Sequence, residues 1–252
     1  MHDPSEIRVL GTPNDVGLAG ALQFVHRAKQ TILENALFTV ALCGGLTCQR
    51  VYSGLVGDPG LHRQLSWQSI HFFFWNDERH LPPDHPQSNY GSMYQQMISK
   101  LLIPSKNVHR FRGELCSARQ AAAEYERQLR KFSAVKLEQV PRFDFVLLNV
   151  GADGHIASLF PGSKALRERK CLVVAHRGDA SPDYRITMTL PVLNNAACVI
   201  FLASGADKAE LLAKMLEGEY RSLEYPTQCI QPSHGQVLWL IDKSAGQLLR
   251  NH

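Results

Sequence analysis

The chain has 252 residues, of which 44% are hydrophobic and 20% charged, and its formal net charge at pH 7 is +4. This balance is typical of a globular protein with enough apolar material for a core. The basic residues are scattered and not interleaved with aromatic residues, which argues against nucleic-acid binding. A small anionic substrate agrees better with the mild positive charge.

Nothing in the sequence predicts a membrane or secreted protein. No apolar stretch approaches the ~18 residues of a spanning helix, and the opening MHDPSEIRVL lacks the apolar segment of a secretory signal. The cysteines lack the paired spacings of a zinc site, and most lie in apolar runs, where a thiol acts as a small hydrophobe. We therefore expect a cytoplasmic protein with free thiols, no metal and no cofactor. The cysteines are Cys43, Cys48, Cys116, Cys171, Cys198 and Cys229.

Apolar, β-rich runs alternate with helical patterns along the chain. Helices are expected at 15–35, 91–102, 117–132 and 206–217, and strands at 37–43, 70–75, 143–150, 171–175, 186–190, 198–203 and 237–241. Several strand runs are continuously apolar, as in strands buried on both faces. The alternation predicts an α/β sandwich with a mostly parallel sheet, and the lack of a flexible linker predicts a single domain over residues 1–252.

Ligands of open α/β sheets bind beyond the carboxyl ends of strands, and four polar clusters occupy such positions in this chain. In the first, LCGGLTCQRVY (42–52), Gly44 and Gly45 follow a strand, and Thr47 lies at the expected start of a helix. Glycines let backbone N–H groups approach an anion, and a helix N-terminus adds a partial positive charge. A tight strand–helix turn with Thr47 as its N-cap would explain the same residues.

The second cluster, in FFFWNDERHLPP (72–83), places charged residues directly after an apolar run. Asp77 and Arg79 would point to the same side of an extended chain. Both a surface ion pair and a pair of functional side chains agree with this pattern.

The third cluster, NVGADGHIASLFPG (149–162), follows another predicted strand. Gly151 and Gly154 permit a tight loop, and Asp153 could orient the imidazole of His155 or hold a substrate hydroxyl. A neutral imidazole, with a reference pKa of ~6.5, can take a proton from water near pH 7. We expect His155 to be a general base over a ligand pocket, with a helix running away beneath it; a structural core histidine is the alternative.

The fourth cluster is a pair of cations. Arg185 precedes a predicted strand, and Lys208 falls in the first turn of the 206–217 helix, where a cation opposes the helix dipole. A bound phosphate would resolve this conflict. A solvated lysine would also be tolerated, since the cost is only ~0.3–1 kcal/mol.

Four longer segments make the chain similar to the 6-phosphogluconolactonase family. They appear in the family's order and span roughly residues 14–249. The segments are NDERHLPPDHPQSNYGSM, FDFVLLNVGADGHIASLFPG, RITMTLPVLNNAACVIFLASGADKAELL and VLWLIDKSAGQLL. Two positions depart from the family pattern: Leu46 stands where many relatives have serine, and Asn149 stands where glycine is usual.

The resemblance implies a Rossmann-like three-layer sandwich, shared with glucosamine-6-phosphate deaminases and ribose-5-phosphate isomerases. It also implies metal-independent hydrolysis of 6-phospho-D-glucono-1,5-lactone to 6-phospho-D-gluconate, the second step of the oxidative pentose phosphate pathway. The expected partner is this phosphorylated lactone, without nucleic acid or membrane, and with a functional link to glucose-6-phosphate dehydrogenase.

The resemblance also assigns roles to residues. By it, His155 is the base that activates water, Asp153 is its neighbour in the site, and Arg79 lies near the lactone carbonyl or the carboxylate product. The residues expected to hold the substrate and its phosphate are Gly44, Gly45, Thr47, Asp77, Arg185 and Lys208.

Two other functions are weighed against lactone hydrolysis. A glucosamine-6-phosphate deaminase shares the DGHIA motif, but such enzymes place a glutamate shortly after it, and here the next carboxylate is Glu168. A non-catalytic sugar-phosphate-binding regulator would share the fold, but such proteins usually carry a DNA-binding segment or lack the base. This sequence keeps His155 and has no such segment before residue 14, which favours the enzyme.

Overall fold

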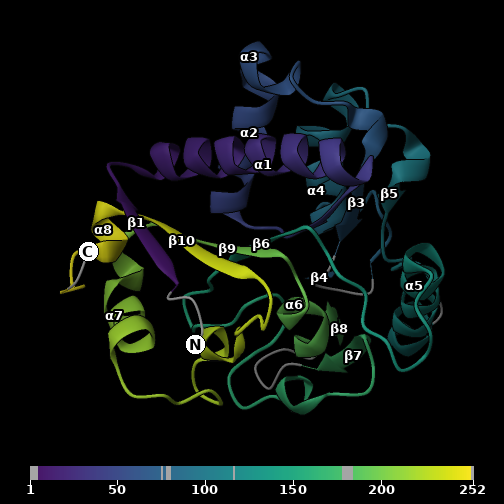
Figure 1. Cartoon of the computed structure of the whole chain (residues 1–252). Coiled ribbons are helices and arrows are strands. Elements are labelled where there is room, and N and C mark those ends of the chain that lie inside the picture. Colours follow the sequence, from purple (N-terminus) through teal and green to yellow (C-terminus); the bar gives the residue numbers. More distant parts are fainter. Residues whose placement is uncertain (1–4, 75, 78–80, 116, 178–183, 251–252) are drawn as a thin grey trace.

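The computed structural model describes residues 5–74, 76–77, 81–115, 117–177 and 184–250. Among them, seven parallel strands form a central sheet in the order β1-β10-β9-β6-β2-β3-β5 (Figure 1). The strands are β1 (Glu6–Leu10), β2 (Phe38–Leu42), β3 (Ile70–Phe74), β5 (Val108–His109), β6 (Phe145–Asn149), β9 (Cys198–Ala203) and β10 (Gln236–Asp242). The predicted α/β architecture with a mostly parallel sheet is therefore confirmed.

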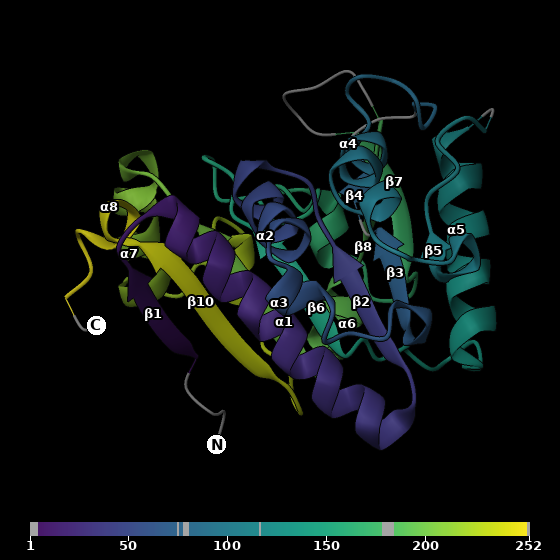
Figure 2. The same cartoon turned by 90° about the horizontal axis from the view of Figure 1, so that it is seen from above.

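Helices cover both faces of this sheet. Figure 1 shows α1 and α2 on one side of it and α6 and α7 on the other, and Figure 2 shows α1 lying over the sheet, roughly along the direction of β10. The helices are α1 (Pro13–Asn35), α2 (Leu46–Gly57), α3 (Pro59–His62), α4 (Asn89–Gln96), α5 (Ala118–Ser133), α6 (Leu190–Asn194), α7 (Ala209–Glu217) and α8 (Lys243–Gly246). The molecule is thus a three-layer sandwich, as the resemblance implies.

Aromatic side chains fill the space between α1 and the sheet. The ring of Phe24 on α1 meets the rings of Phe38 and Phe145 edge-on, each at 5.6 Å between centroids. Phe24 also stacks on Phe72 at 6.3 Å. Every residue of β2 is buried, which explains why this strand is apolar apart from Thr39. The hydroxyl of Thr39 donates to Oδ2 of Asp144 at 2.7 Å.

Two of the predicted strands lie outside the central sheet. β7 (Val173–Arg177) and β8 (Tyr184–Met188) form an antiparallel pair, and β8 also pairs with the short β4 (Asn76–Asp77). β7 is only partly buried, and antiparallel sheets tolerate one solvated face. The two edge strands of the central sheet were not predicted: β1 alternates charged and apolar residues, and β5 has only two residues.

Two predicted helices are shorter than expected. The 91–102 pattern is α-helical only to Gln96 and continues as the 3₁₀ turn Ile98–Lys100. The 206–217 pattern begins with the 3₁₀ turn Ala206–Lys208 before α7. Such tighter turns are common at helix ends.

None of the described helices combines the length and hydrophobicity needed to cross a membrane. The described cysteines are free, and Cys116 lies outside the described residues. The sulfur atoms of Cys43 and Cys48 lie 2.7 Å apart in the core, where burial raises the pKa of the Cys48 thiol.

A pair of histidines at the edge of the sheet indicates that the folded protein is less stable in acid. The ring of His109 stacks on Phe73 at 4.2 Å between centroids, and its Nε2 lies 3.0 Å from Nδ1 of His71. Burial and the neighbouring His71 lower the pKa of His109 from 6.5 to about 4, and burial and Lys106 lower that of His71. The folded chain therefore keeps these rings neutral at a pH where the unfolded chain protonates them.

We expect the free energy of unfolding to fall as the pH drops from 6.5 to about 4, because the unfolded state binds more protons over this range. One pKa unit corresponds to ~1.4 kcal/mol, and since solvent reaches His109 we expect a loss of ~1–2 kcal/mol. Urea unfolding at about pH 7.5 and about pH 4.5 measures this loss. His109→Gln should remove most of the pH dependence, whereas His26→Gln on the exposed face of α1 should keep it. An unchanged dependence in His109→Gln would assign the acid sensitivity to other groups.

Candidate active site

The direction in which the chain proceeds across the sheet reverses between β2 and β6. β2 lies between β3 and β6; the chain continues from β2 toward β3 on one side and from β6 toward β9 on the other. Because these strands are parallel, their carboxyl ends share one edge of the sheet. Ligands of open α/β sheets bind in the crevice at such a switch point.

β6 is followed by a compact loop and not by a helix. The N–H of Gly151 donates to the carbonyl of His155 at 2.9 Å, which closes the loop. Gly154 and Ala157 have φ angles of 85° and 57°, in the left-handed region that a right-handed helix excludes. The next helical residues form the 3₁₀ turn Lys164–Arg167. The prediction of a helix running away beneath His155 is therefore wrong.

The loop places the carboxylate of Asp153 against the imidazole of His155. Oδ1 of Asp153 lies 2.5 Å from Nδ1 of His155 and accepts the backbone N–H of the same residue at 3.1 Å. The side-chain hydrogen bond with His155 is the main cause that lowers the pKa of Asp153, so this carboxylate is ionised near neutral pH and can only accept. Nδ1 must then carry the hydrogen, which leaves Nε2 as the nitrogen able to take a proton.

The same loop requires a glycine and admits solvent. A Cβ on Gly151 would overlap the ring of His155, so a larger residue would displace the imidazole. The side chains of His155 and Asp153 are 31% and 54% exposed. Water can therefore reach the imidazole, as a hydrolytic base requires.

Phe160 lies between His155 and Arg185. Its ring centroid is 4.7 Å from that of His155, and the guanidinium carbon of Arg185 lies 5.9 Å from the Phe160 ring centroid. In the antiparallel sheet, the neighbouring Ile186 pairs with Asp77 of β4. This sheet therefore brings the backbone of Asp77 close to Arg185, on the same side of the molecule as His155.

The N-terminus of α2 forms the second part of the candidate site. Gly45 is the N-cap, with a φ of 103°, and no side chain of the described residues caps this helix end. The helix starts at Leu46, so Thr47 is its buried second residue and not its N-cap. The first N–H groups of an α-helix have no acceptor within the helix, and the dipole is positive there. The Gly44-Gly45 turn therefore offers backbone donors to an anion.

Three side chains that the sequence did not single out as ligands lie at these strand ends. Asn89 contacts Gly44, and the Nδ2 of Asn149 would lie 2.8 Å from a Cβ on Gly45. Nδ2 of Asn89, Oδ1 of Asn149 and Oγ of Ser204 are buried without a hydrogen-bond partner in the described part of the chain. Unsatisfied buried polar atoms are costly, which makes them candidates for ligand contacts. The only signal in the sequence was the position of Asn149 and Ser204 at strand ends.

Lys208 completes the set of predicted cations. It ends the 3₁₀ turn after β9, and its Nζ donates to the Ser204 carbonyl at 3.0 Å and to Oδ2 of Asp207 at 3.1 Å. A Cβ on Gly154 would lie 3.5 Å from Leu211 of α7, so the start of this helix lies beside the His155 loop. Lys208 is 16% exposed, which is more enclosed than a solvated lysine.

The described structure thus brings Asp153, His155 and Arg185 together around Phe160, and places Gly44 and Gly45 next to β6. Arg79 lies outside the described residues. Within the described ranges, no group of three or more His, Cys, Asp or Glu side chains is arranged to hold a metal. The arrangement can hold a phosphorylated ligand and activate a water molecule beside it.

Comparisons with known proteins agree with this chemistry. The sequence family described as glucosamine-6-phosphate isomerases/6-phosphogluconolactonase matches residues 11–239. A 6-phosphogluconolactonase from Synechocystis is 37% identical over 224 residues, which cover 89% of this chain and 90% of the relative.

Solved structures extend the likeness to the fold. The 6-phosphogluconolactonase from Trypanosoma brucei superposes with a TM-score of 0.84 at 27% identity, covering 99% of this chain and all of the other. A monomeric glucosamine-6-phosphate deaminase superposes with a TM-score of 0.80 at 22% identity, covering 96% of this chain and 99% of the other. At that identity the deaminase shares the fold alone, so its activity has to be judged from the site.

Proposed function

The chain belongs to the glucosamine-6-phosphate isomerase/6-phosphogluconolactonase family, and from this premise we propose that it hydrolyses 6-phospho-D-glucono-1,5-lactone to 6-phospho-D-gluconate. The observation that carries the proposal is the Asp153–His155 pair at the carboxyl end of β6, next to the uncapped N-terminus of α2. A base beside an anion-binding helix end suits a phosphorylated substrate that water attacks.

In the proposed reaction, Nε2 of His155 takes a proton from a water molecule whose oxygen attacks the lactone carbonyl carbon. The carbonyl oxygen becomes an oxyanion, and the ring C–O bond then breaks. The imidazolium returns its proton to the ring oxygen, which leaves as a hydroxyl group. The new carboxylic acid ionises and releases one proton. Asp153 orients the ring and stabilises the imidazolium, and Arg79 is proposed to face the oxyanion or the product carboxylate.

The phosphate is proposed to bind between α2 and the two cations. Arg185 and Lys208 supply positive charge, and the Gly44-Gly45 turn with the first turn of α2, including Thr47, supplies backbone N–H groups. The neutral side chains of Asn89, Asn149 and Ser204, together with Asp77, are proposed to contact the substrate hydroxyls and the phosphate.

Glu168 favours hydrolysis over deamination. It is the first carboxylate after His155, but its Oε1 accepts the backbone N–H groups of Arg169, Lys170 and Cys171 at 2.9, 2.7 and 3.0 Å. These bonds, with that of Cys171 the largest contribution, lower the pKa of Glu168. The Glu168 carboxylate is ionised and bound to the backbone of its own turn, so it is poorly suited to transfer protons to or from a sugar carbon.

We expect enzyme-dependent acid release from freshly generated 6-phosphogluconolactone, above the spontaneous rate, and no ammonia from glucosamine 6-phosphate. A pH-stat records the first and a coupled ammonia assay the second. Activity should persist in EDTA, because the proposed ligands are a histidine, cations and backbone groups. Ammonia formation at comparable efficiency would replace the lactonase assignment with the deaminase. Loss of activity on chelation, with recovery on adding a metal, would contradict the mechanism.

The cellular setting is part of the same proposal. We propose a single-domain enzyme that acts in the cytoplasm and takes its substrate from glucose-6-phosphate dehydrogenase. The link needs no physical contact, because the lactone diffuses between the two active sites.

A further inference from the structure

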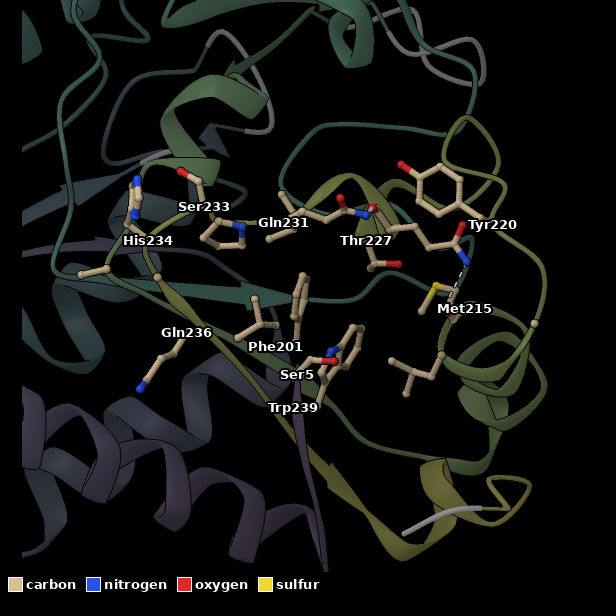
Figure 3. A pocket seen from close by; sticks show the side chains of 18 of the residues that line it. Ser5, Phe201, Met215, Tyr220, Thr227, Gln231, Ser233, His234, Gln236 and Trp239 are labelled. Carbon is tan, nitrogen blue, oxygen red and sulfur yellow. Dashed lines mark hydrogen bonds between the residues drawn. The ribbon is translucent and has the colours of Figure 1, made fainter. Parts of the chain in front are cut away.

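A cavity of about 800 Å³ lies at the opposite edge of the sheet from His155 (Figure 3). It opens near the amino ends of β9 and β10 and continues beneath α7. None of the described residues assigned to the proposed active site lines it. Its volume falls in the range of ~300–1,000 Å³ typical of small-molecule sites.

The floor of this cavity is aromatic. Phe201 of β9 and Trp239 of β10 stack at 4.1 Å between centroids, with 16° between their planes. Met215 and Leu216 of α7 and Ile230 add aliphatic surface around them. Figure 3 shows the two rings near the centre of the cavity, with Met215 beside them. A flat aromatic floor beside an aliphatic helix favours a flat ligand.

A buried hydroxyl group in this lining has no partner among the described residues. Thr227 is only 4% exposed, and its Oγ1 is buried without a hydrogen bond to any described residue. Figure 3 shows the Thr227 side chain near that of Met215. The neighbouring Gln228 instead donates its Nε2 to the carbonyls of Met215 and Glu219 at 3.1 and 3.2 Å. Gln228 therefore holds the wall together, while the Thr227 hydroxyl is left for a ligand.

The charge of the lining is also one-sided. Arg27 lines the cavity, whereas none of the aspartates and glutamates in the described ranges does. One of its terminal nitrogens donates to the Gln236 side chain, which fixes the guanidinium at the rim. Its Nε is buried without a partner in the described part of the chain. A single fixed cation in a partly apolar cavity favours a ligand with one negative charge.

We propose that this cavity is a second ligand site, which binds a flat aromatic molecule carrying one negative charge. The aromatic part lies on Phe201 and Trp239, the anionic group reaches Arg27, and Thr227 supplies a hydrogen bond. The site is separate from the proposed hydrolysis and does not depend on it.

Two fluorescent probes that differ by one charged group test this proposal. 8-Anilinonaphthalene-1-sulfonate is an aromatic monoanion with a flat naphthalene ring system, and N-phenyl-1-naphthylamine is the same framework without the sulfonate. Both should bind the intact protein saturably at one site, the anion with a Kd on the order of 10–100 µM. A signal that rises without saturation would overturn the proposal.

Substitutions in the lining test the contribution of each contact separately. Arg27→Gln should weaken the sulfonate about tenfold and the neutral probe less than about twofold. Thr227→Val should weaken the sulfonate by roughly two- to tenfold. Met215→Trp, which fills the cavity, should weaken both probes at least about tenfold. Leu102→Ala is the control for binding to a fully exposed leucine, since Leu102 is 89% exposed, and should change neither.

Thermal melting shows that each variant is folded, and the near-isosteric Thr227→Val keeps the test valid if Met215→Trp unfolds. Undiminished sulfonate binding in Thr227→Val, or in a folded Met215→Trp protein, would place the probe elsewhere and overturn the site. Equal weakening of both probes by Arg27→Gln would overturn the preference for an anion.

Discussion

Replacing His155 by alanine is expected to lower kcat for the phosphorylated lactone by about 10²–10⁴-fold, the usual effect of removing a positioned general base. The side chain is partly exposed and belongs to a loop closed by its own backbone, so the fold should survive. Stopped or continuous acid-release assays measure kcat, and circular dichroism measures folding. His26→Ala, an exposed histidine on α1, is the control and should retain wild-type turnover.

Asp153→Asn tests how the histidine works. The amide can donate to Nδ1, which would move the ring hydrogen to Nε2. Nε2 could then no longer accept a proton from water. We therefore expect kcat to fall strongly in this variant while KM changes little. A folded His155→Ala protein with near-full turnover would return His155 to a structural role. A fully active Asp153→Asn protein would remove Asp153 from the mechanism.

The second large effect is expected at the phosphate. Hydrogen bonds to charged groups contribute ~1.5–3 kcal/mol, so Lys208→Ala or Arg185→Ala should lower kcat/KM for the phosphorylated lactone about ten- to a hundredfold. If these contacts act equally on substrate and transition state, the loss lies mainly in KM. Unphosphorylated glucono-1,5-lactone, which has no dianion to lose, should be affected far less.

Lys214→Ala is the matched control, because Lys214 is an exposed lysine on α7, the helix that Lys208 directly precedes. It should leave the ratio of kcat/KM for the two lactones unchanged. Equal losses on both lactones in Lys208→Ala and Arg185→Ala would mean that these residues support the fold or the chemistry. The phosphate would then have to bind elsewhere.

The sequence by itself determined the features that rest on neighbouring residues. β2 and β9 are buried along their whole length, so β9 is an uninterrupted apolar run and β2 is interrupted only by Thr39. The Asp153–His155 contact spans two positions of one loop, and its chemistry could be predicted from residue types and spacing. Both features follow from residue types at neighbouring positions, so local pattern is enough to predict them.

Only the tertiary structure decided the features that rest on distant contacts. The loop behind β6 is not a helix, because burying Ile156 and Leu159 takes precedence over local propensity. The strand order brings Asn89 against Gly44 and Asn149 against Gly45, although these residues are far apart in sequence. The pairing of strands depends on how the whole core packs, and no local pattern records it.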